Sequence, residues 1–414
     1  MIKYPKSLDT IFNKLYKNNI KPIIVGGYVR DFFLCIDSND IDIELYGVTS
    51  LDRVEKILHE FGNVNSVGKS FGVCKLFYDN LDLDFSLPRK DNKIAWGHQG
   101  FAVTVEANLD FTTATSRRDF TMNAIGYDVK NKKILDPYNG REDLNKKILK
   151  AVDNKKFAQD PLRVLRAVVF ASRFGMILDE SLELTCKKMI KHNLLAELPK
   201  ERIFQEIKKL LLKSDKPSKG FNLLKSLGAF SYFLELNSLD DRCFKKVFNA
   251  LNRLKTLHVT RDKEFVTLAL AVITSKFPDE ETQNFLHRIT NEKRLIEKVL
   301  ILHQLHFNLE DFNDYDIYTL ATKIDIEFYS HYLHVTHTKK EKVQHLLQRA
   351  KELGVLHKPV PAIIEGKDLI QLGLQPSKEF SNILKNAYKA QIKSIFKDKK
   401  NAILWLKESL ALKL

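Results

Sequence analysis

Hydrophobic residues in the first 90 positions form short runs separated by turn residues, a pattern typical of strands and short helices. KPIIVGG at residues 21–27 is an apolar run that ends in two glycines, and DIDIELY at residues 40–46 alternates between polar and apolar positions. We therefore expect a compact α/β head at the start of the chain. Its expected strands cover residues 21–27, 40–46, 71–78 and 81–87, and its expected helices cover residues 28–35 and 51–61.

Beyond residue 145 the strand pattern nearly vanishes, and apolar residues recur at helical spacing. This change predicts a head over residues 1–145 and a long helical part after it. The chain shows neither a low-complexity tract nor a convincing internal repeat. The expected helices cover residues 158–174, 181–193, 201–213, 241–256, 283–305 and 379–395.

The composition indicates a soluble globular protein. Of the 414 residues 44% are hydrophobic and 29% are charged, which excludes collagen-like and broadly disordered chains. No apolar run reaches membrane-spanning length, and the first six residues lack the apolar stretch of a signal peptide. The four cysteines lie far apart and form no CxxC pair, as expected for a reducing compartment. We expect a cytoplasmic protein without a membrane partner.

Positive charge is concentrated in the helical part. Residues 1–145 hold 19 Lys and Arg against 20 Asp and Glu, whereas the rest of the chain carries a net charge of +16. A solvated basic surface would explain this distribution without any partner. An asymmetry of this size is more often found in proteins that bind a polyanion, so we favour a nucleic-acid-binding body.

A glycine pair is the first candidate for chemistry. Gly26 and Gly27 join an expected strand to an expected helix, where backbone N–H groups and the helix dipole can approach a phosphate. Arg30 lies one turn into that helix and could reach the same anion. Taken alone, such a pair is more often a tight connection than a binding site.

Two carboxylates on the next strand make a site more probable. Asp40 and Asp42 point to the same face, and two like charges at that spacing are costly unless a cation lies between them. Mg²⁺ fits because it prefers oxygen ligands and keeps positions for water and substrate phosphates. Asp84 could add a general base or hold a second metal ion, but Asp82 and Asp84 could equally form the polar face of an exposed strand.

A pair of arginines could complete a nucleotidyl-transfer site. Arg117 and Arg118 would neutralise the charge that develops on a leaving pyrophosphate. An ion pair with the neighbouring Asp119 is the structural alternative, and both roles can coexist.

Four motifs in this order resemble the bacterial class II tRNA nucleotidyltransferase and poly(A) polymerase family, within the polymerase-β-like superfamily. They are GGYVRD, NDIDIELYG, RRDFTMNAIGYD and QDPLRVLRA, and they span about residues 20–175. Weaker similarity continues at LPKER (198–202) and returns near residues 366–373 and 391, as in the tail of long bacterial members. The resemblance implies an α+β fold: a nucleotidyltransferase head with a small mixed sheet (1–145), then an elongated helical neck (146–215) and a helical body and tail (216–414).

The resemblance also implies roles for individual residues. Gly27 and Arg30 match nucleotide-contacting positions, Asp40 and Asp42 match metal ligands, and Arg117 and Arg118 match the family's arginine pair. Asp160 and Arg163 match a motif that selects the incoming base. Their spacing of three places acceptors and donors on one helical face, although Asp160-Pro161 is also typical of a helix start.

Arg166 continues that face and is a further nucleotide candidate. Two departures from the family pattern affect this helix. Gln159 stands where Glu is usual, which removes a charge that could orient the neighbouring arginine, and Val169 stands where many members carry another Arg.

The implied reaction adds CCA to the 3′ end of tRNA from CTP and ATP, with two Mg²⁺ ions at the site and the acceptor arm of tRNA on the helical body. Poly(A) polymerase and CC-only or A-only addition are alternatives, as is a non-catalytic RNA-binding protein. Residues 96–101 (WGHQGF) show no obvious deletion in the loop that CC-adding members shorten, which argues against CC-only addition.

The histidines suggest no additional site. No His-Asp pair occurs, so a metal-dependent phosphohydrolase domain is not expected. His331, His334 and His337 are interpreted as surface or packing residues.

Overall fold

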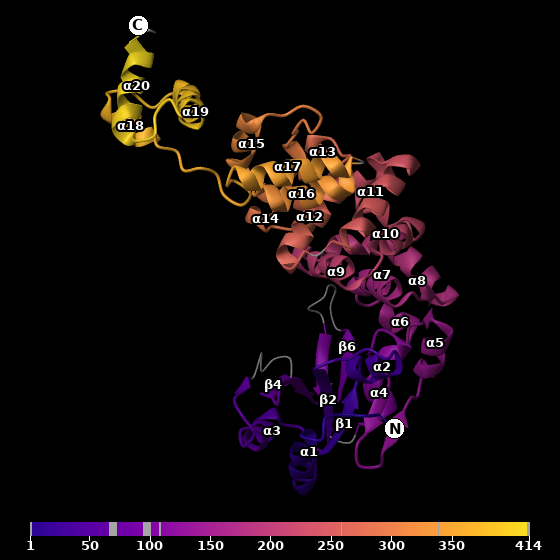
Figure 1. Cartoon of the computed structure of the whole chain (residues 1–414). Helices are drawn as coiled ribbons and strands as arrows, with labels where there is room; N and C mark the ends of the chain where they lie inside the picture. The colour runs from indigo at the N-terminus through magenta and orange to yellow at the C-terminus, as the bar shows by residue number, and fades with distance from the viewer. Residues whose placement is uncertain are drawn as a thin grey trace. The chain divides into compact units, whose positions relative to one another are not determined.

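The structure is a computed structural model that describes residues 2–65, 73–93, 101–106, 109–257, 259–337 and 339–411 (Figure 1). The chain divides into two compact units. The first contains Met1–Ser238 with Phe285–Asn291, and the second contains Leu239–Asn284 with Glu292–Leu414. Both expected boundaries, after residues 145 and 215, fall inside the first unit.

A seven-stranded mixed sheet forms the core of the head, in the order β3-β4-β5-β2-β1-β8-β9. Strand β2 pairs antiparallel with β1 and parallel with β5, which confirms the expected α+β head. The strands are β1 (Lys21–Val25), β2 (Asp40–Tyr46), β3 (Val64–Asn65), β4 (Val73–Tyr78), β5 (Leu81–Ser86), β8 (Gly126–Asp128) and β9 (Lys133–Leu135).

Short helices connect these strands, and a separate two-stranded sheet stands beside them. Strand β6 (Arg89–Lys93) pairs antiparallel with β7 (Phe101–Val105). Residues 94–100 lie outside the described residues. They include most of the loop, around residues 96–101, whose length was used to argue against CC-only addition. Residues 71 and 72 of an expected strand also lie outside the described residues. The head helices are α1 (Leu8–Lys17), α2 (Gly27–Phe33), α3 (Leu51–Leu58) and α4 (Phe111–Thr115).

Helices dominate the rest of the first unit, around α7 (Leu162–Phe174). This helix begins after Pro161, where the Asp160 carboxylate accepts a hydrogen bond from the Leu162 N–H at 3.1 Å, and it ends at Gly175 with φ +64°. It packs against α9 (Lys200–Lys213) and α10 (Pro217–Ser226). The remaining elements of this part are α5 (Gly140–Lys146), α6 (Asn154–Phe157), α8 (Glu180–Lys191), β10 (Ile148–Leu149) and β11 (Ile177–Leu178).

The second unit is helical and is built around α12 (Asp262–Thr274), which is buried at every position from Phe265 to Thr274. Helices α11, α14 and α16 pack on it. The helices of this body are α11 (Asp241–Leu254), α14 (Lys293–Gln304), α15 (Asp314–Ala321), α16 (Ile326–Thr336) and α17 (Lys340–Glu352). In the described residues no helix is both long and apolar enough to cross a membrane.

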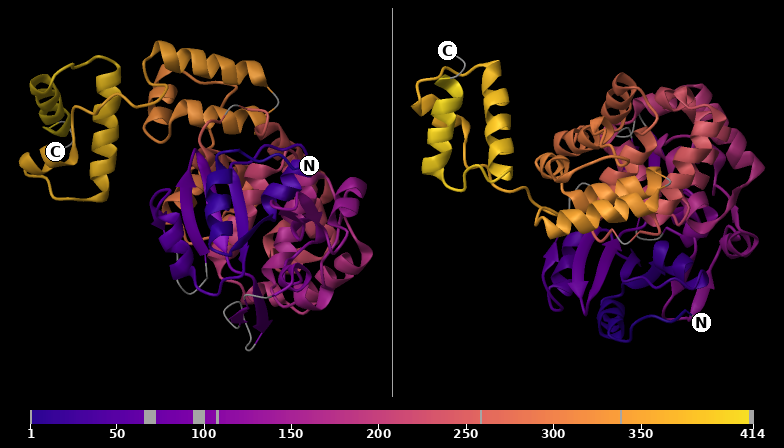
Figure 2. Two further views of the ribbon diagram at one scale, coloured as in Figure 1. Left: turned by 90° about the horizontal axis from the view of Figure 1, so that it is seen from below. Right: turned by 45° about the horizontal axis from the view of Figure 1, so that its top comes forward.

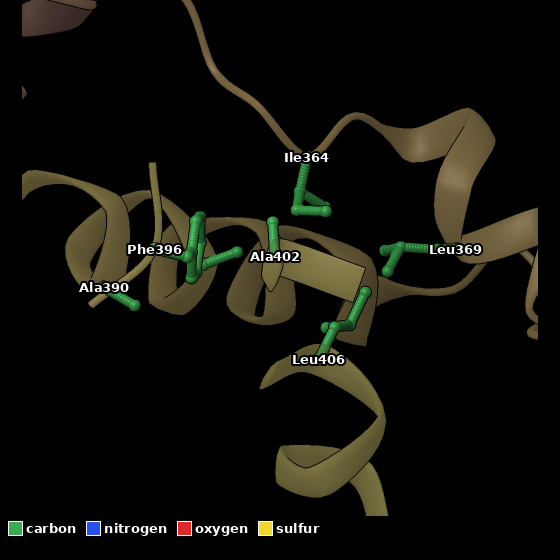
Figure 3. Packing of buried hydrophobic residues seen from close by; sticks show 7 residues of the cluster. Ile364, Leu369, Ala390, Phe396, Ala402 and Leu406 are labelled. Carbon is green, nitrogen blue, oxygen red and sulfur yellow. The ribbon is translucent and has the colours of Figure 1, made fainter. Parts of the chain in front are cut away.

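The tail consists of α18 (Gly366–Gln371), α19 (Lys378–Ile392) and α20 (Lys399–Ala411), which lie together in both views of Figure 2. The three helices bury their own apolar cluster, so the tail has a hydrophobic core of its own. Figure 3 shows this core, which includes Ile364, Leu369, Ala390, Phe396, Ala402 and Leu406.

The single helix expected over residues 283–305 is wrong. Two helices occupy this segment, α13 (Asp279–Ile289) and α14. The break falls where the chain passes from one unit to the other, and the Asn291 amide donates to Glu201 at 2.8 Å. Apolar periodicity continues through the break, because Phe285 and Ile289 are buried before it and Leu295 and Val299 are buried after it.

The expected helix 158–174 is also too long at its start, because the chain forms a turn between α6 and Leu162. All four cysteines are free, as expected.

Candidate active site

The glycine turn brings the chain close to a carboxylate and a guanidinium. Gly26 has φ +69° between β1 and α2, a conformation that favours glycine, and its N–H donates to the Ile125 carbonyl at 3.2 Å. A Cβ atom at Gly26 would lie 2.7 Å from Arg118 Nη1 and 3.2 Å from Asp42 Oδ2. The structure therefore places Gly26, Asp42 and Arg118 together, although they are far apart in the sequence.

Gly26→Ala should lower any activity that depends on Arg118 by about tenfold or more, because the new methyl group must displace the guanidinium. The left-handed backbone should also cost about 1–3 kcal/mol of stability. Steady-state kinetics combined with thermal unfolding would measure both effects.

Gly228→Ala is the matched control, because Gly228 has φ +85° and no heavy atom would lie within 4 Å of its Cβ. It should lose stability and keep activity. Equal losses of activity in the two variants would show that backbone strain alone is responsible.

Three carboxylates converge at the edge of β2 and β5. Asp42 pairs in register with Val25 on one side and with Asp84 on the other, and Asp40 pairs with Asp82. Burial raises the pKa of Asp42, and Asp40 and Asp84 add to the shift although Arg118 opposes it. Partial burial and then Asp84 raise the pKa of Asp40. The ionised carboxylates thus repel each other, which is the condition that a bound cation relieves.

Asp84 already has a basic partner. The Lys75 ammonium, on the neighbouring strand β4, contacts its carboxylate at 2.7 Å. A hollow of about 700 Å³ lies beside this pair and is also lined by Asp40 and Asp82. Asp84 is thus held in place next to Asp42 and at the edge of open space, a position compatible with a proton acceptor.

Arg117 and Arg118 reach the site from the segment after α4. Arg117 Nη2 donates to Glu44 Oε1 at 3.2 Å, and the fully buried Glu44 also accepts from the Tyr46 hydroxyl at 2.6 Å. Burial lowers the pKa of Arg118, against the attraction of Glu44 and Asp42. Within the described residues, the Nε atoms of both arginines are buried and have no hydrogen-bond partner.

A pocket of about 180 Å³ joins these groups. Asp42, Asp84, Arg117 and Arg118 line it, together with Arg89 and Ser86. A pocket lined by both carboxylates and guanidinium groups suits a phosphate group that carries a metal ion.

Arg30 occupies an internal position. Its guanidinium donates to Asp31 and to Asn123 Oδ1, each at 2.8 Å, and lies over the rings of Phe170 and Phe174 at 5.3 and 4.9 Å. These contacts tie α2 to α7. A Cβ atom at Gly27 would lie 3.6 Å from Arg30 Nη2, so the side chain also stays close to the glycine turn.

The residues expected to select the base lie at the start of α7. Arg163 donates to the carbonyls of Lys156 and Arg117, at 3.0 and 2.7 Å. These two backbone acceptors orient the guanidinium. Asp160 caps the helix and lies 3.4 Å from Arg202 Nη2.

The other family positions on α7 differ in burial. Arg166 donates through Nε and Nη2 to Asp119 Oδ2, at 2.8 and 2.5 Å. Val169 is 6% exposed and belongs to the core.

Sequence reasoning missed several supporting residues. Glu44 continues the alternation of Asp40 and Asp42 on one face of β2, which could have identified it as a partner for the arginines. Asn123 donates to Asp119 at 2.9 Å and accepts from Arg30, whereas its position in the sequence gives no such signal. Among the described residues, no group of three or more His, Cys, Asp or Glu side chains is arranged to hold a metal ion.

Comparisons with known proteins agree with this architecture. The family model of the poly A polymerase head domain matches residues 23–150, and that of the probable RNA and SrmB-binding site of polymerase A matches residues 175–239. A "CCA-adding enzyme" of Lactobacillus helveticus is 27% identical over 420 residues, which cover 97% of this chain and 98% of the relative.

Other relatives match over a shorter part. A "Multifunctional CCA protein" of Laribacter hongkongensis is 32% identical over 215 residues, so the match spans about half of this chain and half of that protein. The solved CCA-adding enzyme of Bacillus stearothermophilus in complex with CTP shares the fold, with a TM-score of 0.74 at 21% identity, over 100% of this chain and 99% of that one.

Proposed function

Since the chain belongs to the class II tRNA nucleotidyltransferase and poly(A) polymerase family, we propose that it builds the CCA end of tRNA from CTP and ATP. The observation that carries this proposal is the pocket that Asp42 and Asp84 line together with Arg117 and Arg118. Such a site can hold a nucleoside triphosphate by its phosphates.

Asp40 and Asp42 would hold Mg²⁺. Their raised pKa values indicate two crowded carboxylates, and Mg²⁺ is commonly bound by one or two carboxylates together with substrate phosphates and water. When bound, Mg²⁺ would neutralise phosphate charge and lower the pKa of a coordinated hydroxyl.

In the proposed reaction the RNA 3′-oxygen forms a bond to the α-phosphorus of the nucleotide, and the bond to the pyrophosphate oxygen breaks. Arg117 and Arg118 would stabilise the negative charge that develops on pyrophosphate. Asp84, held by Lys75, would accept the hydroxyl proton. The backbone N–H groups that begin α2 after Gly26 would face the phosphates.

Base selection would take place at α7. Asp160 offers acceptors and Arg163 offers donors, and Arg202 stands beside Asp160 as a further donor. Lys156 and Arg117 carbonyls fix the Arg163 guanidinium, so little conformational freedom is lost when a base binds.

The surrounding parts would serve the same reaction. We assign the head to residues 1–145, a nucleotide-selecting neck to residues 146–215 and a tRNA-binding body and tail to residues 216–414. The positive charge of the body and tail would hold the acceptor arm of tRNA through its phosphates and its shape, since the deep groove of A-form RNA hides the bases. The site of action would be the cytoplasm.

The test measures incorporation of labelled CTP and ATP into tRNA transcripts that lack CCA, CA or A. The two nucleotides are supplied separately and together, always with Mg²⁺. Addition of C, C and A that then stops is the expected result. Use of ATP on the CC-ending transcript alone would replace the proposal by A-addition, and long A tails would replace it by poly(A) synthesis. Tight tRNA binding without incorporation would favour a non-catalytic RNA-binding protein.

A further inference from the structure

The hollow of about 700 Å³ beside the candidate active site lies over strands β4, β5 and β2. Its lining includes the carboxylates Asp40, Asp82 and Asp84 together with Phe77. Among the described residues that line it, only Lys75 is basic, and its ammonium contacts the Asp84 carboxylate at 2.7 Å. Three carboxylates against one paired ammonium would repel a phosphate, so the hollow suits an uncharged group.

Strand register divides one face of β4, β5 and β2 into three rows. The first row is Val73, Ser86 and Glu44, the second is Lys75, Asp84 and Asp42, and the third is Phe77, Asp82 and Asp40. The pocket of about 180 Å³ that Arg117 and Arg118 line includes residues of the first two rows, whereas the hollow includes residues of the last two. The two spaces therefore meet at the second row.

The geometry of nucleotidyl transfer assigns these two spaces to different reactants. The attacking and leaving oxygens lie roughly in line at the phosphorus, so the acceptor enters on the side opposite to the leaving pyrophosphate. Pyrophosphate would lie with Arg117 and Arg118 at the first two rows. The third row, with its hollow, then faces the end of the RNA acceptor.

Phe77 offers a free aromatic ring in this third row. Its side chain is 64% exposed, although Cys74 and Leu76 on the other face of β4 are buried. No other phenylalanine in the described part of the chain is exposed to a comparable degree. An exposed ring suits a nucleobase, and such stacking tolerates any base because every base has a π-face.

Asp82 lies between Phe77 and Asp40 in the same row. Its carboxylate is exposed and has no hydrogen-bond or ion-pair partner in the residues that the structure describes. An ionised carboxylate accepts hydrogen bonds and donates none, so it suits the hydroxyls of a ribose. Neighbouring strands lie about 4.8 Å apart, so the backbones at Phe77 and Asp40 are about 10 Å apart, a span that a ribose and its base can bridge.

We propose that the hollow seats the terminal nucleoside of the RNA acceptor, with its base stacked on Phe77 and its 2′-hydroxyl donating to Asp82. This inference rests on the proposed function and adds to it two residues that position the acceptor. Because stacking tolerates any base, one seat serves every successive end of the growing RNA. The contact with the 2′-hydroxyl distinguishes an RNA acceptor from a DNA acceptor.

The test measures KM and kcat of the full chain with ATP, Mg²⁺ and tRNA transcripts that end in CC. In one transcript the last nucleotide is intact, in a second it is an abasic ribose, and in a third it is 2′-deoxycytidine. Phe77→Ala should raise the KM of the intact transcript by about tenfold with little change in kcat, because stacking stabilises the bound acceptor before and during transfer alike. The KM of the abasic transcript should not change, since it has no base to stack.

Asp82→Ala should raise the KM of the intact transcript by about tenfold as well, because a hydrogen bond to a charged group is lost. Its effect should vanish on the transcript that ends in 2′-deoxycytidine. Two conservative variants should keep most of the wild-type affinity for the intact transcript, since Phe77→Trp retains an aromatic ring and Asp82→Asn retains an acceptor.

Ile177→Ala is the matched control for Phe77→Ala. Ile177 is 76% exposed on β11 and lines neither the hollow nor the arginine-lined pocket. Its truncation removes an exposed apolar side chain from the surface and should change the KM of none of the three transcripts.

An equal rise in KM of the intact and abasic transcripts in Phe77→Ala would overturn the stacking role of Phe77. An equal rise for the intact and 2′-deoxy transcripts in Asp82→Ala would overturn the role of Asp82. If the protein incorporates no nucleotide, the proposed transfer fails, and equilibrium affinities for the same transcripts decide the inference. Affinity lost in the variants for the intact transcript alone would support the seat, and unchanged affinity would overturn it.

Discussion

Replacing Asp42 by Asn should reduce nucleotide incorporation at least about 1,000-fold, because the substitution removes a metal-binding charge at the centre of the site. The fold should not suffer. The folded-state pKa of Asp42 is raised, so its ionised form opposes folding at neutral pH, and the neutral amide removes that cost. The melting temperature measured without Mg²⁺ should therefore stay the same or rise by a few degrees.

Asp52→Asn is the matched control for Asp42→Asn. Asp52 is an exposed carboxylate in the first turn of α3, outside both pockets of the head. It should change neither incorporation nor tRNA affinity. A joint loss of folding and tRNA binding in Asp42→Asn would show that the carboxylate is structural, and retained incorporation would remove it from the reaction.

Strand β2 shows how far local pattern determines the structure. Its alternation predicted residues 40–46, and the structure places the strand at Asp40–Tyr46. Because Ile41, Ile43 and Leu45 occupy the fully buried apolar face, a shift by one residue would place the carboxylates among apolar neighbours, so the register is strongly specified. The placement of Asp40 and Asp42 on one face follows from the same alternation.

Helix α12 shows where pattern fails. Its buried run from Phe265 to Thr274 is apolar on all sides, because other helices surround it, and so it carries no amphipathic period. No helix was predicted there. The break between α13 and α14 was missed because buried apolar residues at helical spacing continue on both sides of it.

The site shows the same limit. Spacing brought Asp40 and Asp42 together, but the contact of Gly26 with Arg118 depends on tertiary packing. Arg30 was expected to touch nucleotide, and its described donors point to Asp31 and Asn123 inside the protein. A sequence motif identifies such a residue, but it does not distinguish a side chain that contacts the nucleotide from one that holds the site in place, since both roles require the same side chain.

Asp119→Asn should cause the largest loss of stability, about 3–5 kcal/mol, because it breaks a buried ion pair and leaves Arg166 without its charge partner. Asp119 accepts from Asn123 and Arg166, and Asn123 in turn accepts from Arg30, so a continuous chain of hydrogen bonds joins α2 to α7. Nucleotide incorporation should fall as well, because these hydrogen bonds link the glycine turn to the base-selecting helix. Incorporation is measured well below the melting temperature, so that unfolding does not contribute.

The dependence of the melting temperature on pH in the acidic range distinguishes a contribution of this ion pair from one of packing alone. Burial acts to raise the pKa of Asp119, but Arg166 and Asn123 outweigh it and the folded pKa is lowered. The stabilisation is therefore complete above the unfolded pKa of about 3.9 and disappears as pH falls through the lower folded value. Below the folded-state pKa of Asp119, the wild-type protein and Asp119→Asn should therefore have similar melting temperatures.

A double-mutant cycle with Arg166→Met isolates the pair. Two side chains in direct contact should show a coupling energy of about 2–3 kcal/mol. By contrast, Lys146→Ala, which breaks the exposed pair with Glu142, should leave the melting temperature unchanged. Additive effects of the two substitutions would mean that Asp119 stabilises the fold through Asn123 and the Phe120 N–H alone. In that case α7 would be held to the head by packing around Phe170, and the hydrogen-bonded chain would not connect base selection to the glycine turn.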